Sequence, residues 1–333
     1  MKCRHRVLLA APLVGLLLTQ LEAADSRPNV LMIAVDDMRD WVGHLGGCPG
    51  TVHTPNIDRL AARGTAFTNA HTASPVCCPS RAAVMSGRLP SSTGIYGNGH
   101  WWKPHRPDLA TLPVHFRRHG YVAVGAGKLF HHTVGNNPPG QWDAYHRLTF
   151  NDDAWTRVSK RFKALYPFTK PQPVPAGFPF SGLVLYSPEV DWGILSKPER
   201  DFDDARTIDY GIEFLSRRHD RPFFLACGTF RPHLPWYTPR KYVDLYPLDE
   251  IKLPEAPPDD LDDVPEAGRR LALAKADDLE KVRDAGKWKE AVRMYLASIS
   301  FADAQVGRLL DALDRSPAKG NTIVVLWSDH GWH

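Results

Sequence analysis

The stretch NVLMIAV at residues 29–35, followed at once by Asp36 and Asp37, decides the fold class. A continuous apolar run without polar alternation is typical of a strand that is buried on both faces, as in a parallel sheet. Runs of the same character recur at residues 121–125, 222–228 and 322–327. Helical patterns alternate with these runs. The sequence therefore predicts an α/β fold with a mostly parallel central sheet flanked by helices.

The helical segments are marked by apolar spacing and by glycines that follow them. We predict helices at residues 54–63, 80–85, 109–119, 203–218 and 288–313. Residues 135–197 and 232–265 are rich in proline and aromatic residues and have weak periodicity. We expect these two segments to be long ordered excursions from the sheet.

The composition is that of a folded globular protein. The chain has 333 residues, a formal net charge of +4 and 43% hydrophobic residues, which excludes a disordered chain. No run of like charge suggests a nucleic-acid tail, so we expect no nucleic-acid partner. The 29 prolines and 10 tryptophans favour long loops around a site over a helical bundle.

The first 24 residues have the pattern of a secretory signal peptide. A basic start with Lys2, Arg4 and Arg6 precedes an apolar run at residues 7–18, which is too short to span a bilayer, and small residues follow at Ala23 and Ala24. We predict a signal peptide at residues 1–24 and a catalytic domain at 25–333. The mature protein would be secreted or periplasmic, or lysosomal in a eukaryote, without a stable membrane anchor. An uncleaved N-terminal anchor is the alternative.

The cysteines that remain after this segment do not form a disulfide framework. Cys48, Cys77, Cys78 and Cys227 are spaced too unevenly, although an exported chain can pair them. The adjacent pair Cys77–Cys78 also lacks the spacing of a zinc site. The doublet needs another explanation.

Acidic residues directly follow the first and the last predicted strands. Asp36 and Asp37 end one strand, and Asp329 and His330 end the other. Because sites in parallel sheets lie beyond the carboxyl ends of the strands, these side chains can converge on a hard cation such as Ca²⁺ or Mg²⁺. Helix caps or turns are the alternative interpretation of Asp36 and Asp37.

The segment Cys77–Arg81 fits the pattern Cys-x-Pro-Ser-Arg and resembles the type I, formylglycine-dependent sulfatases of the alkaline-phosphatase superfamily. Residues 53–60, 86–88, 127–131 and 231–235 resemble further elements of that family. Residues 328–332, SDHGW, are similar to its iduronate-2-sulfatase branch. The resemblance extends over residues 28–333 and implies an alkaline-phosphatase-like fold.

The resemblance implies that a formylglycine-generating enzyme oxidises Cys77 to formylglycine, whereas Cys78 stays a packed thiol. One hydroxyl of the hydrated aldehyde would attack sulfur, and the other would expel sulfate. Residue 77 at the start of its helix would put the sulfate near backbone N–H groups and the positive end of the helix dipole. The cation, Ca²⁺ with Mg²⁺ as the alternative, would be held by Asp36, Asp37, residue 77, Asp329 and His330.

Four further residues receive roles from the same resemblance. Arg81 would orient the diol, and Lys128 with His131 would bind sulfate and the diol. His233 would bind sulfate and protonate the leaving alcohol. His100, His105 and His132 lack motif support and are expected to be solvated. Trp101, Trp102, Trp142 and Trp192 could either stack on a sugar or pack in the interior.

We therefore expect hydrolysis of sulfate esters on sulfated glycans. The resemblance suggests the 2-O-sulfated uronic acid type, and algal polysaccharides or other sulfate esters are the alternative substrates. A phosphodiesterase or phosphonate hydrolase, or an inactive remnant that binds sulfated glycans, are the alternatives. Family members continue beyond the position of His333 with a further active-site lysine and a C-terminal subdomain. We expect a truncated chain whose last strand sits inside the sheet and lacks its cover.

Overall fold

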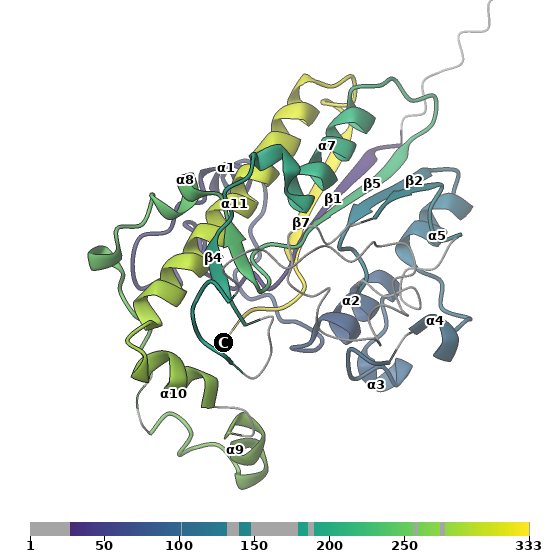
Figure 1. Ribbon diagram of the computed structural model, residues 1–333. Coiled ribbons are helices and arrows are strands. Elements are labelled where there is room, and N and C mark those ends of the chain that lie inside the picture. Colours follow the sequence, from purple (N-terminus) through teal and green to yellow (C-terminus); the bar gives the residue numbers. More distant parts are fainter. Residues whose placement is uncertain are drawn as a thin grey trace, which may run out of the picture.

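The computed structural model describes residues 27–100, 102–131, 140–147, 179–185, 190–255, 257, 259–273 and 277–332. Its centre is a five-stranded sheet of order β3-β2-β5-β1-β7, in which every pair is parallel (Figure 1). The strands are β1 (Asn29–Val35), β2 (Val122–Gly127), β3 (Ala144–His146), β5 (Phe223–Thr229) and β7 (Thr322–Ser328). The predicted α/β fold with a parallel sheet is confirmed.

Helices cover both faces of this sheet, and β1 directs apolar side chains toward each face. Leu31, Ile33 and Val35 pack in one hydrophobic cluster with α7 (Asp203–Leu215) and α11 (Trp288–Arg315). Met32 and Ala34 pack in a second cluster with α2 (Cys77–Ser86) and α4 (Trp102–His105). The remaining helices beside the sheet are α1 (Pro55–Ala62), α3 (Pro90–Thr93) and α5 (Leu112–Arg118).

The two predicted excursions contain short elements. β4 (Trp192–Ile194) pairs with β6 (Trp236–Thr238) in a separate parallel sheet. The second excursion also contains α8 (Arg240–Val243) and η3 (Leu248–Glu250). Outside the two excursions, the chain forms η2 (Glu199–Asp201), α9 (Glu266–Leu273) and α10 (Asp277–Asp284). Much of the first excursion, at 135–139, 148–178 and 186–189, lies outside the described residues.

Two predicted helices differ at their starts. The helix expected at residues 80–85 begins at Cys77, because the Ser80 N–H already donates to the Val76 carbonyl at 3.1 Å. The helix expected from Leu109 begins at Leu112, with Pro113 in its first turn, where a missing N–H costs nothing.

The position of the last strand also differs from the expectation. Among the described strands β7 is the end of the sheet order rather than an internal member. Its outward side chains Ile323 and Val325 are 51% and 44% exposed. An apolar run alone does not distinguish an internal strand from an edge strand, because the pattern says nothing about which neighbours pair with it.

The four cysteines of the described chain are free thiols, so no disulfide joins them. Cys78 and Cys227 are buried in the two hydrophobic clusters. Among the described residues, no helix combines the length and the apolar character needed to span a membrane. The predicted signal peptide lies outside those residues.

Candidate catalytic site

The polar side chains predicted from the sequence gather at the carboxyl end of the sheet. Parallel strands bring their ends to one edge, so residues hundreds of positions apart become neighbours there. β1 leads into Asp36 and Asp37, β2 into Lys128 and His131, β5 into His233, and β7 into Asp329 and His330, while α2 brings Cys77 and Arg81.

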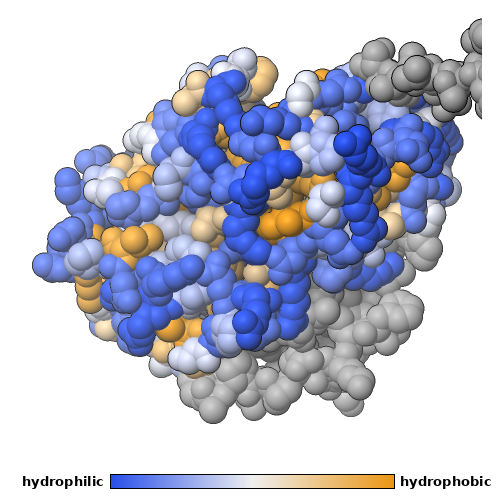
Figure 2. Space-filling view, turned by 90° about the horizontal axis from the view of Figure 1, so that it is seen from above, coloured by the Kyte–Doolittle hydropathy of each residue, from blue (hydrophilic) through white to orange (hydrophobic). Residues whose placement is uncertain are grey.

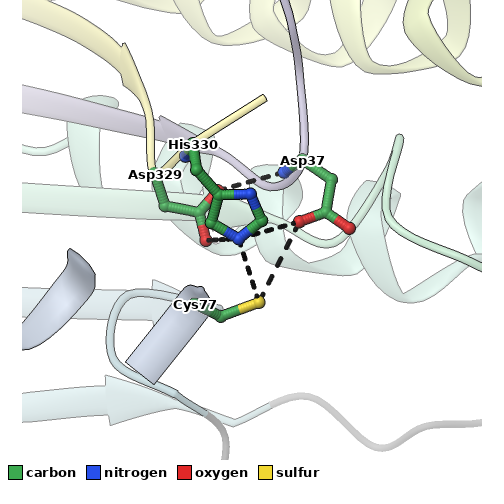
Figure 3. Close-up of side chains that lie close together, drawn as sticks. All are labelled: Asp37, Cys77, Asp329 and His330. Carbon is green, nitrogen blue, oxygen red and sulfur yellow. Dashed lines mark hydrogen bonds and ion pairs between the residues drawn. The ribbon is translucent and has the colours of Figure 1, made fainter. Parts of the chain in front are cut away.

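Asp37, Cys77, Asp329 and His330 form one compact group (Figure 3). The His330 Nε2 atom lies 3.3 Å from the Cys77 Sγ atom, 3.3 Å from Asp37 Oδ1 and 3.6 Å from Asp329 Oδ2. The Cys77 Sγ atom lies 3.9 Å from Asp37 Oδ1. Their ligand atoms all lie within 4.8 Å of one another.

The backbone at Asp37 is held in an unusual conformation. Its φ of 57° lies in the left-handed region, which non-glycine residues seldom adopt. Its N–H donates to Asp329 Oδ1 at 3.0 Å, and its carbonyl accepts from the Tyr295 hydroxyl at 2.8 Å. These contacts from β7 and α11 hold the turn that aims the Asp37 carboxylate at residue 77.

Asp36 lies in a different setting from the other carboxylates. It is fully buried and accepts from Arg81 Nη2 at 2.6 Å and from Lys128 Nζ. Burial alone would raise its pKa, but Lys128 and Arg81 together hold the pKa of Asp36 at about 2. Asp36 also belongs to a second group with Asp37 and His233, whose ligand atoms lie within 4.8 Å of one another. The expectation that all five residues hold one cation stays a prediction.

Arg81 contacts the carboxylates rather than the thiol. Its guanidinium is fully buried, and besides Asp36 it donates through Nε to Asp329 at 2.9 Å. It also donates to the carbonyl of Leu129 at 3.2 Å. Arg81 thereby bridges the carboxylates at the ends of β1 and β7, and its expected role toward the diol of residue 77 stays a prediction.

The site carries more buried negative than positive charge. Asp36, Asp37 and Asp329 face the two cations Arg81 and Lys128. Burial, together with the neighbouring charges of Asp36 and Asp329, raises the pKa of Asp37 well above its usual range. A divalent cation would relieve this repulsion, so the donor set fits such an ion.

The orientation of His330 fits the same ion. Its Nδ1 donates to the Gly331 carbonyl oxygen at 2.7 Å, so in the neutral ring the Nε2 lone pair faces Asp37 and Asp329. A lone pair directed at two carboxylates is unfavourable without a positive charge between them. Two carboxylates and this nitrogen are thus available as ligands.

The environment of Cys77 makes its thiol a poor nucleophile. Burial raises the pKa of Cys77 well above its usual value, and nearby Lys128 only partly offsets this effect. A thiol with a raised pKa stays protonated at neutral pH, and the thiolate is the reactive form. An unmodified Cys77 is therefore unsuited to attack an ester.

The expectation that free backbone N–H groups at the start of α2 lie near the sulfate is wrong for residues 78 to 80. The Cys78 N–H donates to Asn98 Oδ1 at 2.9 Å, Pro79 has no N–H, and the Ser80 N–H is used inside the helix. An anion at this end of α2 cannot use these donors. Asn98 was not found by sequence reasoning, because it lies in a loop with no pattern that links it to residue 78.

His131 and His233 are both positioned at the site in their neutral forms. Burial, followed by the charge of Lys128, lowers the pKa of each well below its usual value. The His233 Nε2 atom lies 3.8 Å from Asp37 Oδ2, and its Nδ1 donates to the Leu234 carbonyl. Neutral His233 thus presents an acceptor, and donation from Nε2 requires that it first gain a proton.

Three of the four tryptophans left open by the sequence pack in the interior. Trp102 stacks on Phe130, Trp142 stacks on Phe224, and Trp192 lies against Trp236. All three are buried, so they do not form a sugar platform. His100 and His105 are exposed, as expected, whereas Trp101 and His132 lie outside the described residues.

Comparison with known proteins gives consistent matches over nearly the whole chain. A family model described as Sulfatase matches residues 28–333. A protein named Sulfatase from Formosa agariphila is 38% identical over 323 residues, which cover 94% of this chain and 60% of that protein. Iduronate 2-sulfatase from Homo sapiens is 32% identical over 335 residues, which cover 94% of this chain and 56% of that protein.

A solved structure shares the fold at lower identity. The phosphonate monoester hydrolase of Agrobacterium radiobacter superposes with a TM-score of 0.69 at 20% identity, and the match covers 92% of this chain and 63% of that one. The match of this chain thus spans 56% to 63% of the length of these three proteins.

Proposed function

This chain belongs to the sulfatase family, and on that premise we propose that the protein hydrolyses sulfate esters at the site around residue 77. The observation that carries the proposal is the placement of Cys77 at the start of α2, facing Asp37, Asp329 and His330 and backed by Arg81 and Lys128. A nucleophile, carboxylates and buried cations meet there at the carboxyl end of the sheet.

The nucleophile would be residue 77 after oxidation of Cys77 to formylglycine. The high pKa of the unmodified thiol supports this modification, because the thiol itself is a weak nucleophile at neutral pH. The hydrated aldehyde supplies one hydroxyl that attacks sulfur and a second that allows sulfate to be expelled. A formylglycine-generating enzyme would be the maturation partner.

Residues of this chain would move protons around that group. Asp37 Oδ1 lies 3.9 Å from the side-chain atom of residue 77 and can accept a proton from it. Lys128 and His131 would contact the sulfate oxygens, and Lys128 also neutralises Asp36.

His233 would protonate the leaving alcohol. Its pKa is lowered by burial and Lys128, so it needs an added negative charge to gain the proton. The sulfate group of a bound substrate supplies such a charge. Protonation at Nε2 would then convert His233 from acceptor to donor at the moment when substrate is present.

A divalent cation, Ca²⁺ or Mg²⁺, would be held by Asp37, Asp329, His330 and residue 77, with Asp36 beside them. When bound, it supplies positive charge that lowers the pKa of a hydroxyl and stabilises developing negative charge. The unbalanced carboxylates support this assignment.

The substrate would be a sulfated glycan with 2-O-sulfated uronic acid. The 32% identity to iduronate 2-sulfatase and the SDHGW segment at residues 328–332 support this choice. A phosphonate or phosphate ester is the second candidate, because the structure also resembles a phosphonate monoester hydrolase. The predicted signal peptide supports export of the mature protein, whether secreted, periplasmic or lysosomal.

The test compares turnover of a chromogenic sulfate with that of the matching phosphate and phosphonate by the full-length protein, made in a host with the maturing enzyme. We expect the sulfate to be preferred, an aldehyde at residue 77 by peptide mass spectrometry, and loss of turnover in Cys77→Ala. Cys48→Ala is the matched control, because Cys48 is half-buried and lies outside the site. A preference for phosphate, or binding of sulfated glycans without turnover, would contradict the proposal.

A further inference from the structure

The opposite end of the molecule carries five exposed cations. They are Arg118, Arg218, Arg221, Arg315 and Lys319, which we call the amino-end surface. All five lie at or just beyond the ends of α5, α7 and α11, on the connections that lead into β2, β5 and β7. Figure 2 looks down on this end and shows long hydrophilic side chains over much of it.

Sheet topology brings these connections together. β2, β5, β1 and β7 are consecutive neighbours, so their starts span three strand spacings, or about 15 Å. Arg221 precedes β5 by two residues and Lys319 precedes β7 by three. Arg27, two residues before β1, lies in the same row and donates to the His119 carbonyl.

The charges of the amino-end surface are not balanced. Within the described part of the chain, none of its five side chains has a hydrogen bond or ion pair. The connections at 119–121, 216–222 and 316–321 contain a single carboxylate, Asp220. By contrast, Arg117 pairs with Asp143 and Arg217 with Glu213 close by.

The helix dipole explains the presence of only two of the five cations of the amino-end surface. Basic residues in the last turn of a helix complement its dipole, which explains Arg118 and Arg315. Arg218, Arg221 and Lys319 lie beyond the helices and have no such role. Exposed cations of one sign at one end of the molecule make a positive potential, which attracts a polyanion.

We propose that the amino-end surface binds a polysulfated glycan chain at a site separate from the catalytic one. Four of the five side chains are arginines, whose planar guanidinium groups form paired hydrogen bonds with the oxygens of sulfate groups. A single exposed ion pair contributes little, so affinity requires several simultaneous contacts along one chain. The choice of sulfate as the anion rests on the proposed function.

The two sites lie at opposite ends of the strands. Seven residues of β1 span about 23 Å, so only a long glycan can reach both. Binding at the amino-end surface would then raise the local concentration of the same chain at the catalytic site. A short sulfated substrate cannot bridge the two ends and would gain nothing from this surface.

The experiment measures binding of dextran sulfate to the full-length protein at about 50 mM NaCl, where charge contacts are strong. The variant Arg118→Ser/Arg218→Ser/Arg221→Ser removes three cations from the amino-end surface. The control Arg240→Ser/Lys252→Ser/Arg270→Ser changes the net charge equally. It removes exposed cations that form no ion pair with another described residue, on α8, the segment after η3 and α9. Turnover of a chromogenic sulfate is measured on all three proteins.

We expect the amino-end variant to lose at least about tenfold in affinity for dextran sulfate, with a weaker salt dependence. The affinity of the control variant for dextran sulfate should stay within about twofold of that of the unmodified protein. Turnover of the chromogenic sulfate should be unchanged in both variants. Equal losses in both variants, or tighter binding of a short DNA duplex than of dextran sulfate, would overturn the proposal. Loss of binding in the variant with no turnover by any protein would refute the proposed function and still support this binding site.

Discussion

Replacing Arg81 by methionine tests the electrostatic design of the site. Arg81 is completely buried and donates to Asp36 at 2.6 Å and to Asp329 at 2.9 Å. Removing one partner of a buried ion pair costs about 3 to 5 kcal/mol, because the other charge stays buried without compensation. Asp36 keeps Lys128, whereas Asp329 loses its one guanidinium contact. We therefore expect a loss of about 4 kcal/mol in the free energy of unfolding at pH 7.5.

The loss should be smaller at lower pH. Burial raises the pKa of Asp329 even with Arg81 present, so without the guanidinium this carboxylate takes up a proton readily. Below that pKa the Asp329 carboxyl without its arginine partner is neutral, and the free-energy cost of burying it falls. Arg81→Lys can reach one carboxylate but cannot bridge two, so its loss in the free energy of unfolding should be intermediate.

The assay is chemical denaturation at pH 5 and pH 7.5 in the presence of a chelator, which removes any bound cation. Arg240→Met is the control, because Arg240 is exposed, and such surface changes stay within about 0.5 kcal/mol. A loss below about 1 kcal/mol at pH 7.5, or an equal loss at both pH values, would refute the reasoning.

Three further predictions follow from other parts of the chain. Asp329→Asn should weaken Ca²⁺ binding by at least about tenfold in calorimetry, whereas Asp220→Asn should leave it unchanged, and equal effects would contradict the cation site. Burial raises the pKa of Asp204 to about 6 from 3.8, so its contribution to stability is full below pH 3.8 and is lost as the pH rises through 6. Compared with Asp204→Asn, the free energy of unfolding of the unmodified protein should therefore fall by about 3 kcal/mol between pH 3.5 and pH 7, as measured by denaturation curves. A difference between the two proteins that does not change with pH would contradict this. The double variant Ile323→Lys/Val325→Lys should increase the soluble yield of residues 1–333, because both side chains lie exposed on the edge strand β7, and an unchanged yield would argue against this edge as a cause of aggregation.

Sequence patterns were enough to predict four strands of the central sheet and the edge at which the site lies, but not β3, which falls in a segment expected to leave the sheet. Uninterrupted apolar runs require burial on both faces, and parallel strands bring their carboxyl ends to one edge. That is why Asp36, Asp37, Asp329 and His330 could be placed together from their positions after two strands. The resemblance of residues 77–81 to a known motif identified Cys77, and no periodicity would have done so.

The contacts between side chains across that edge could not be predicted and are known only from the folded chain. Arg81 and Lys128 take the Asp36 carboxylate, and Asn98 takes the Cys78 N–H, because loops and helices from distant segments pack over the strand ends. The Tyr295 hydroxyl from α11 holds the Asp37 carbonyl across 258 positions. The amino-end surface is likewise invisible in a nearly neutral sequence, since its cations come from three separate connections. Local patterns encode burial and period, but partners at long range are chosen only when the packed helices and strands set the distances between them.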